Sequence, residues 1–322
     1  MHIIRAALIA AVLTGAAATA GAQGAYPVKP IRFILPVAAS STSDTLSRMI
    51  ATQLSERLGQ QIIIDNQPGA GGNLGVPLAA RAPADGYTML LISSAQAISP
   101  SIYPKLTYDL LRDFAPVTQL TAGLYMLVVH PSVPVRSVKE LIALARARPG
   151  QLTFGSAGTG TGTHLTGELL KASAKIDLLH VPYRGMGPAT GELLGGQLSM
   201  VFSGLPSGIP HMKSGKVRAL GVTSASRSKA APELPTLAEA GLPGFESTTW
   251  QGLAVPAATP REIINRLHAE SVKVVHSEDT RARLAAMGTD PVGSSPEQFA
   301  GYVKSETAKW GKLIRAIGLR LE

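Results

Sequence analysis

The chain contains no cysteine among its 322 residues. This absence excludes disulfide bonds, cysteine-ligated zinc, iron–sulfur clusters and a thiol nucleophile. Charged residues are also scarce, at 16%, whereas 45% of the residues are hydrophobic. That is too little charge for a disordered chain and enough apolar material for a substantial core. The length favours two globular domains.

The chain also lacks an apolar run long enough to span a membrane, and its N-terminus contains a short one. Residues 1–22 place Arg5 before an apolar run from Ala6 to Leu13, and small residues follow, with Ala20 and Ala22 at the −3 and −1 positions. This pattern predicts a secretory signal peptide that is cleaved before Gln23. The alternative, a membrane anchor, needs roughly 20 apolar residues. We therefore expect an exported, periplasmic protein, without a lipid anchor because no lipobox cysteine exists.

Acidic residues are fewer than basic ones, 21 against 30, which gives a net charge of +9. The excess either attracts anions or forms a solvated surface without a specific partner. The basic residues are dispersed, and no aromatic-interleaved basic patch or nucleic-acid motif is present. We expect no nucleic-acid partner.

The order of predicted elements alternates between strand and helix. Alternating apolar residues predict a strand over 31–35. Apolar residues spaced for one helix face predict a helix from near Asp44 to Gly59, and the apolar run Ile62-Ile63-Ile64 predicts a second strand. This βαβ unit indicates a parallel sheet and an α/β fold. Further strands are predicted at Tyr87–Ile92, Tyr125–Val129, Leu152–Phe154, Leu178–Val181, Met200–Phe202 and Val217–Val222.

Three segments carry the residue pattern of a helix N-terminus, a capping Ser or Thr followed three residues later by Glu or Gln. They are Ser137–Glu140, Thr259–Glu262 and Ser295–Gln298, and the last two also have proline at the expected first helical position. The third segment predicts a long C-terminal helix that ends at Gly318.

Two loops of small residues, Pro36–Ser43 and Gly155–Thr163, connect a predicted strand to a predicted helix. Small residues let the backbone approach a ligand, and the free N–H groups at a helix N-terminus favour an anion. In open α/β sheets, ligands bind at this edge of the strands. Each loop alone is also compatible with a simple tight turn. Neither loop matches a dinucleotide fingerprint or a P-loop.

Catalytic patterns are weak. The GxSxG elbow and the HExxH zinc motif are both absent. Ser156 and His164 lie eight residues apart, but no acid marks a third partner. The sequence therefore predicts no catalytic site, no metal and no cofactor.

Seven short segments occur in a characteristic order between Tyr26 and Trp310. They are Tyr26–Arg32 (YPVKPIR), Asn66–Asn73 (NQPGAGGN), Pro83–Thr88 (PADGYT), Tyr183–Ala189 (YRGMGPA), Gly195–Gln197 (GGQ), Leu234–Gly244 (LPTLAEAGLPG) and Trp250-x-Gly252. The ordered set resembles the Bug/TctC family, the solute-binding proteins of tripartite tricarboxylate transporters.

The resemblance implies the two-lobed fold of type II periplasmic binding proteins, with two crossovers between the lobes. We place the crossovers near 124–129 and 246–250. Lobe one is then 26–125 together with 250–322, and lobe two is 126–249. Proteins of this kind close around a ligand by hinge motion.

The resemblance also implies which residues bind the ligand. The first family loop, PFxxGGxxD, maps onto Pro36–Asp44, with Val37 in place of an aromatic residue and Ser40-Ser41 in place of Gly-Gly. Asp44 is expected either to contact a ligand amine or to favour its helix N-terminus. The second family loop, SxGxGSxxHL, maps onto 156–165, and Ser203 stands where the family often has Asp. The expected ligand-binding residues are Val37, Ser40, Ser41, Asp44, Ser156, Gly158, Thr159, Gly160, Thr161, His164 and Ser203.

The function implied is that of a monomeric receptor that captures a small carboxylate between its lobes and delivers it to a two-component membrane permease. No covalent step is needed, so we do not expect an enzyme. Two alternatives remain open from the residues alone. One is a secreted hydrolase or transferase that acts in the same cleft, and the other is a ligand sensor for signalling.

Overall fold

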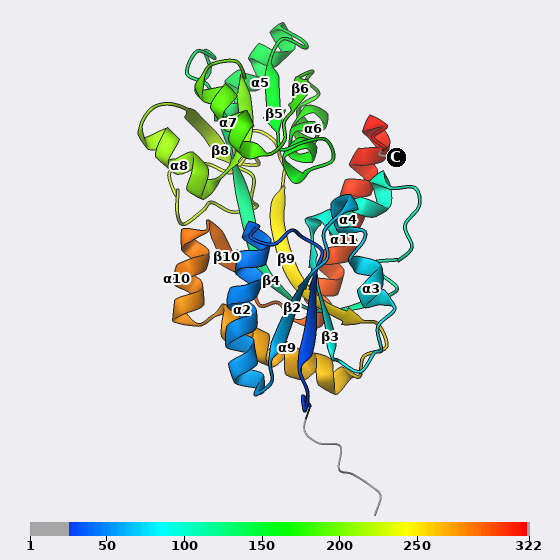
Figure 1. Cartoon of the computed structure of the whole chain (residues 1–322). Coiled ribbons are helices and arrows are strands. Elements are labelled where there is room, and N and C mark those ends of the chain that lie inside the picture. The colour runs from blue at the N-terminus through cyan, green and yellow to red at the C-terminus, as the bar shows by residue number, and fades with distance from the viewer. Residues whose placement is uncertain (1–25, 321–322) are drawn as a thin grey trace, which may run out of the picture.

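The computed structural model describes residues 26–320 and consists of two lobes (Figure 1). A ten-stranded sheet passes through both lobes in the order β2-β1-β3-β9-β4-β7-β5-β6, and β8 and β10 also pair with β4. The α/β fold and the two lobes expected from the sequence are confirmed.

The first lobe, lower in Figure 1, holds one half of this sheet and the helices around it. Its strands are β1 (Ile31–Leu35), β2 (Ile62–Asn66), β3 (Thr88–Ser93), β9 (Thr248–Pro256), β10 (Thr289–Pro291) and the first part of β4 (Phe114–Val129). Its helices are α2 (Thr42–Leu58), the 3₁₀ turn η1 (Ala70–Gly72), α3 (Val76–Ala80), α4 (Ser94–Ile102), α9 (Arg261–Val275), α10 (Glu278–Ala286) and α11 (Pro296–Ile317).

The second lobe holds the remainder of β4 with four further strands. These are β5 (Thr153–Ser156), β6 (Leu179–Pro182), β7 (Met200–Gly204) and β8 (Arg218–Val222). Its helices are α5 (Val138–Ala147), α6 (Gly162–Ala174), α7 (Met186–Leu194) and α8 (Leu205–Lys213).

Strand β4 belongs to both lobes. Its residues 114–124 pair with β9, and its residues 125–129 pair with β7 and, from Met126, with β8. The sequence predicts only the second part as a strand. The first part contains Pro116 and Gly123 and shows register irregularities, so its apolar alternation is broken. A second connection runs through Ser247, whose N–H donates to Thr223 O just before β9 begins.

Strand directions make the two lobes face each other. The strands β1, β2 and β3 are mutually parallel, β3 is antiparallel to β9, and β9 is antiparallel to β4. The first three strands therefore run in the direction of β4, toward the second lobe. Strand β7 is antiparallel to β4, and β5 and β6 run parallel to β7, toward the first lobe. The carboxyl ends of both sets thus point at the same interlobe space.

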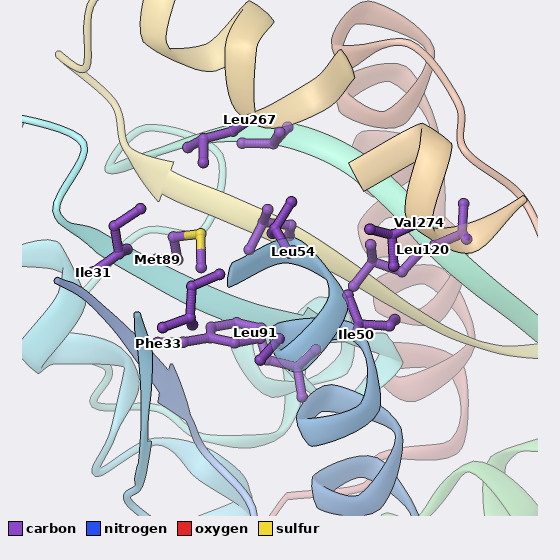
Figure 2. Packing of buried hydrophobic residues seen from close by; sticks show 14 of the residues in the cluster. Ile31, Phe33, Ile50, Leu54, Met89, Leu91, Leu120, Leu267 and Val274 are labelled. Atoms are coloured by element: carbon purple, nitrogen blue, oxygen red, sulfur yellow. The ribbon is translucent and has the colours of Figure 1, made fainter. Parts of the chain in front are cut away.

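Each lobe has its own hydrophobic core. In the first lobe, apolar residues at helical spacing on α2 pack with α9 against one face of the sheet (Figure 2). The labelled members are Ile31, Phe33, Ile50, Leu54, Met89, Leu91, Leu120, Leu267 and Val274. The second core includes Leu127, Phe154, Leu170, Met200 and Phe202. A smaller cluster joins the lobes, because Leu165 of α6 packs with Trp310 and Ile314 of α11.

The helix-terminus predictions are confirmed in part. Helix α2 ends at Gly59 and α11 ends at Gly318, both in the left-handed conformation, and Ser295 with Gln298 forms a complete capping box. Ser137 caps α5, but the carboxylate of Glu140 accepts from the N–H of Arg136, one residue earlier than a capping box requires.

The predicted cap at Thr259 is wrong. Pro260 occupies the N-cap position of α9 and provides no side-chain cap. The hydroxyl of Thr259 donates instead to Pro256 O, at 2.7 Å, so it closes the turn that precedes the helix.

A buried carboxylate ties α11 to the crossover region. Glu306 is 4% exposed and accepts from the indole N–H groups of Trp250, at 3.3 Å, and Trp310, at 3.0 Å, which are the two tryptophans of the chain. Lys309 forms an ion pair with it. Trp250 pairs with Ala122 on β4, so this contact holds the strand that leaves the second crossover.

We expect Glu306→Ala to lower the free energy of unfolding by about 3 kcal/mol, because two buried indole N–H groups lose their acceptor. Urea denaturation followed by tryptophan fluorescence measures this loss. Glu297→Ala, on the same helix, removes an exposed ion pair with Arg261 and should cost less than about 1 kcal/mol. Equal losses for the two variants would contradict the role given to Glu306.

Candidate ligand-binding site

The first loop, between β1 and α2, is held by the buried carboxylate of Asp44. This carboxylate accepts from Ser40 N at 2.8 Å, from Asn66 Nδ2 at 2.8 Å and from Arg48 Nε at 3.0 Å. Burial alone would raise the pKa of Asp44, but these hydrogen bonds outweigh it and lower the pKa below the ordinary value. Asp44 also lies in the first turn of α2. Its oxygens are therefore engaged within the loop, an arrangement that favours the helix-end role over contact with a ligand amine.

The two serines that replace the family glycines have different positions. Ser41 is the N-cap of α2, and its hydroxyl accepts from Asp44 N at 3.2 Å. Ser40 is exposed and has φ +63°, in the left-handed region where glycine is at ease and an L-residue is strained. Val37 packs against the core of the first lobe, and its carbonyl accepts from Asn66 Nδ2.

The second loop, between β5 and α6, is closed by hydrogen bonds from its own residues. Ser156 is fully buried, and its Oγ lies 2.7 Å from Nε2 of His180 and accepts from Gly158 N at 3.1 Å. Thr161 is the N-cap of α6, and its hydroxyl donates to Gly158 O at 2.6 Å. Thr159, at the tip of the loop, is exposed. The loop is therefore preshaped before any ligand arrives.

Two neutral histidines stack beneath this loop. The rings of His164 and His180 have centroids 3.9 Å apart, and Phe154 stacks on His180 at 4.8 Å. The Nδ1 atom of His164 accepts from Gly160 N at 3.0 Å, so the proton of the neutral ring is on Nε2. Burial, followed by nearby positive groups, lowers the pKa of each ring to about 4.

These contacts leave several backbone N–H groups of both loops as free donors. Within residues 26–320, the N–H groups of Thr42 and Ser43 on α2 and of Gly162 and Thr163 on α6 have no protein acceptor. They belong to the first turns of the two helices, where no intrahelical partner exists and the partial positive charge is concentrated. The exposed Thr159 has the same free N–H.

The two helix N-termini lie on opposite sides of the interlobe space. The end of β3, Ser93, pairs with Gln251, and Gln251 pairs with Thr121 of β4. The end of β7, Gly204, pairs with Tyr125. Thr121 and Tyr125 are four residues apart on β4, about 13 Å at the usual rise per strand residue. The strands β3 and β7 thus end on opposite sides of the crossover, and they run parallel to β1 and β5, which lead into α2 and α6.

Ser203 is placed differently from the other predicted site residues. It is 4% exposed, and its hydroxyl donates to Gly204 O. A Cβ on Gly208 would lie 3.3 Å from its Oγ, so Ser203 packs against α8. Its side chain is therefore almost entirely buried in the second lobe.

Sequence reasoning missed three residues that support the loops. His180 bonds Ser156, Asn66 bonds Asp44, and Gln251 Nε2 donates to Ser43 Oγ at 2.8 Å. Asn66 and Gln251 lie within two of the ordered segments, Asn66–Asn73 and Trp250-x-Gly252. The signal that could have found His180 and Asn66 is that each lies on a strand adjacent to a loop-bearing strand, β6 beside β5 and β2 beside β1.

Two absences hold for the part of the chain that the structure describes. Residues 26–320 contain no group of three or more His, Asp or Glu side chains that could hold a metal ion. They also contain no helix whose length and hydropathy would suffice to cross a bilayer. The predicted signal peptide, residues 1–22, lies outside the described residues.

The strain at Ser40 predicts an order of stabilities. Ser40→Gly should be more stable than Ser40→Ala by about 1 kcal/mol, because both variants lack the hydroxyl and only glycine relaxes at φ +63°. Urea denaturation of the two variants gives the difference directly. An alanine variant as stable as the glycine variant would show that the loop is not strained at this residue.

The histidine stack predicts a pH dependence. Folded-state pKa values of about 4 lie below the ordinary 6.5, so the unfolded chain binds protons that the folded chain does not. Stability is therefore complete above pH 6.5 and falls as the pH drops toward 4, by at most about 1.4 kcal/mol per pH unit for each ring. Denaturation between pH 6.5 and 5 measures the slope, before most carboxylates titrate.

His164→Asn is the matched variant for this prediction. Asparagine retains an acceptor for Gly160 N–H but does not titrate, so the slope between pH 6.5 and 5 should fall by about half. An unchanged slope would mean that other groups cause the pH dependence.

Comparison with known proteins identifies the family. The model of the tripartite tricarboxylate transporter family receptor matches residues 46–319. A protein encoded in the tcbD-tcbE intergenic region of Pseudomonas sp. strain P51 is 41% identical over 307 residues, which cover 95% of this chain and 91% of that protein. BugT of Bordetella pertussis is 34% identical and covers 92% of each chain.

Solved structures agree with the sequence relatives. The structure of R. palustris Rpa4515 with adipate superposes with a TM-score of 0.76 at 34% identity, covering 92% of this chain and all of the other. MatC from Rhodopseudomonas palustris with bound malate gives 0.72 at 31% identity, covering 90% of this chain and all of MatC. A TctC solute-binding protein from Polaromonas gives 0.82 at 28% identity, covering 90% and 99%. The chain therefore belongs to the TctC family of tripartite tricarboxylate transporter receptors, as the ordered sequence segments indicated.

Proposed function

We propose that this protein is a periplasmic receptor that binds a small carboxylate between its two lobes and delivers it to a two-component membrane permease. The observation that carries the proposal is the pair of helix N-termini, α2 and α6, which offer free N–H groups from opposite lobes. Such groups bind an anion without any cationic side chain.

The donor arrangement fits a carboxylate better than a neutral ligand. Ser41, Ser156 and Thr161 already use their hydroxyl groups inside the loops, whereas the N–H groups at both helix N-termini are unused. Carboxylate oxygens accept such bonds in a charge-assisted form. The relatives Rpa4515 with adipate and MatC with malate support the same ligand class.

Closure of the lobes completes the site in this proposal. We assign lobe one to residues 26–125 and 250–322 and lobe two to 126–249, with hinges where β4 passes from β9 to β7 and where Ser247 leads into β9. Closing brings the α6 donors onto a carboxylate already held by α2. Only one copy of the chain is needed, so we propose a monomer.

Binding without chemistry is the simplest role for this cleft. Ser156 pairs with His180 at 2.7 Å, the arrangement of a nucleophile with its base. Ser156 is, however, completely buried and engaged in the turn of its own loop, so a substrate has no access to it. This favours a receptor over a hydrolase or transferase.

Isothermal titration with adipate and malate, after unfolding and refolding to remove any bound ligand, tests the proposal. We expect saturable binding of at least one acid with one site per chain. Hexanoic acid amide, which lacks the charge, serves as control and should bind at least tenfold more weakly. Equal binding of the amide and the acids would contradict the anion site.

Thr42→Pro tests the α2 donors. Proline at the first helical position removes one N–H without disturbing the helix, and Ser41 already has the extended conformation that precedes proline. The Ser295-Pro296 start of α11 shows the same local geometry in this chain. Loss of one charge-assisted hydrogen bond should weaken carboxylate binding about 10- to 100-fold.

Thr42→Ala is the matched control, because it removes the same side chain and retains the N–H. It should bind within about threefold of the unchanged protein. If both variants bind equally well, the N–H of Thr42 does not contact the ligand.

A further inference from the structure

A second pocket lies between the lobes, outside the site described above. Its volume is about 450 Å³. One wall comes from the loop after β8 in the second lobe, with Arg227 and Lys229. The other comes from the end of α9, from α10 and from β10 in the first lobe, with His276, Arg281 and Asp290.

The pocket lies beside the hinge strand. Strand β10 pairs with β4 at residues 121–123, immediately before the crossover. Strand β8 pairs with β4 from Met126, immediately after it. A Cβ on Gly288 would collide with the ring of Pro206, so the lobes already touch at the turn between α10 and β10.

Its charged groups are predominantly basic and partly unpaired. Arg227 is engaged with Glu239 at 2.8 Å. Lys229 and Arg281 form no ion pair with any carboxylate of residues 26–320, and Arg281 donates to Nδ1 of His276 at 3.3 Å. Asp290 is the one acid among the residues that line the pocket.

We propose that this pocket binds a small dianion, of the phosphate or short dicarboxylate class, that bridges the two lobes. Lys229 would hold it from the second lobe and the Arg281 guanidinium from the first. A dianion is favoured over a monoanion because it meets an unpaired cation on each wall. Its chemistry differs from that of the α2–α6 site, whose donors in the proposal above are backbone N–H groups.

The proposal predicts whether each substitution weakens or strengthens anion binding. Lys229→Gln and Arg281→Gln each remove one cation and should each weaken anion binding, although they lie in different lobes. Asp290→Asn removes the opposing charge and should strengthen binding. Arg283→Gln, also on α10, should change nothing, because Arg283 is engaged with Asp279 and does not line the pocket.

These changes in affinity are measured by NMR titration of the ¹⁵N-labelled mature protein with inorganic phosphate at constant ionic strength. Backbone amide shifts are read residue by residue, so binding at residues 226–229 and 276–291 is seen separately from binding at Ser43 or Gly162. The result therefore does not depend on whether the interlobe cleft binds a carboxylate. Sodium chloride at matched ionic strength is the reference titration.

We expect saturable shifts on both walls of the pocket with phosphate and not with chloride. Lys229→Gln and Arg281→Gln should each raise the dissociation constant at least fivefold, Asp290→Asn should lower it at least twofold, and Arg283→Gln should leave it within twofold. Shifts that chloride reproduces, or that only one of the two cation variants weakens, would overturn the bridging site.

Discussion

The architecture depends on one constraint, a single strand shared by two lobes. Residues 114–124 of β4 pair with β9, and residues 125–129 pair with β7 and β8, so both halves of the sheet take their direction from the same backbone. Because β1 to β3 run with β4 and β5 to β7 run against it, the carboxyl ends of both sets face the crossover. The loops that follow β1 and β5 are thereby placed opposite each other (Figure 1).

Within that frame, the side chains of the two loops shape the backbone. Asp44 fixes the first loop through Ser40 N, and the Ser156–His180 pair fixes the second. The side chains of Ser41, Asp44, Ser156 and Thr161 are used internally, and the helix-terminal N–H groups remain for an anion. Such preorganisation lowers the entropic cost of binding, because the donors are ordered before the ligand arrives. The ordered conformation of the second loop requires His164 and His180 to be neutral, so its stability depends on pH.

Much of this structure can be predicted from the sequence, and the exceptions have physical causes. The ordered segments identify the family, the apolar alternation predicts β1, and the run of three isoleucines predicts β2. The first part of β4 escapes prediction because Pro116 and Gly123 break its pattern, and its pairing with β9 joins residues more than a hundred positions apart. Thr259 is mispredicted because its hydroxyl finds a nearer carbonyl at Pro256.

The sequence predicts which two loops form the candidate site but not which of their atoms are free to bind a ligand. Both loops were found from their small residues and from the helix that follows each one. Which groups stay free could not be predicted, since that depends on His180 and Asn66, which are brought to the loops only by strand pairing.

A crystal structure of the complex with adipate would show whether both helix N-termini bind the ligand. We expect one carboxylate bound at both helix N-termini, with one oxygen about 3 Å from the backbone N of Ser43 or Thr42 and the other about 3 Å from the backbone N of Gly162 or Thr163. A carboxylate held by side chains alone, or by one lobe only in a closed structure, would contradict it.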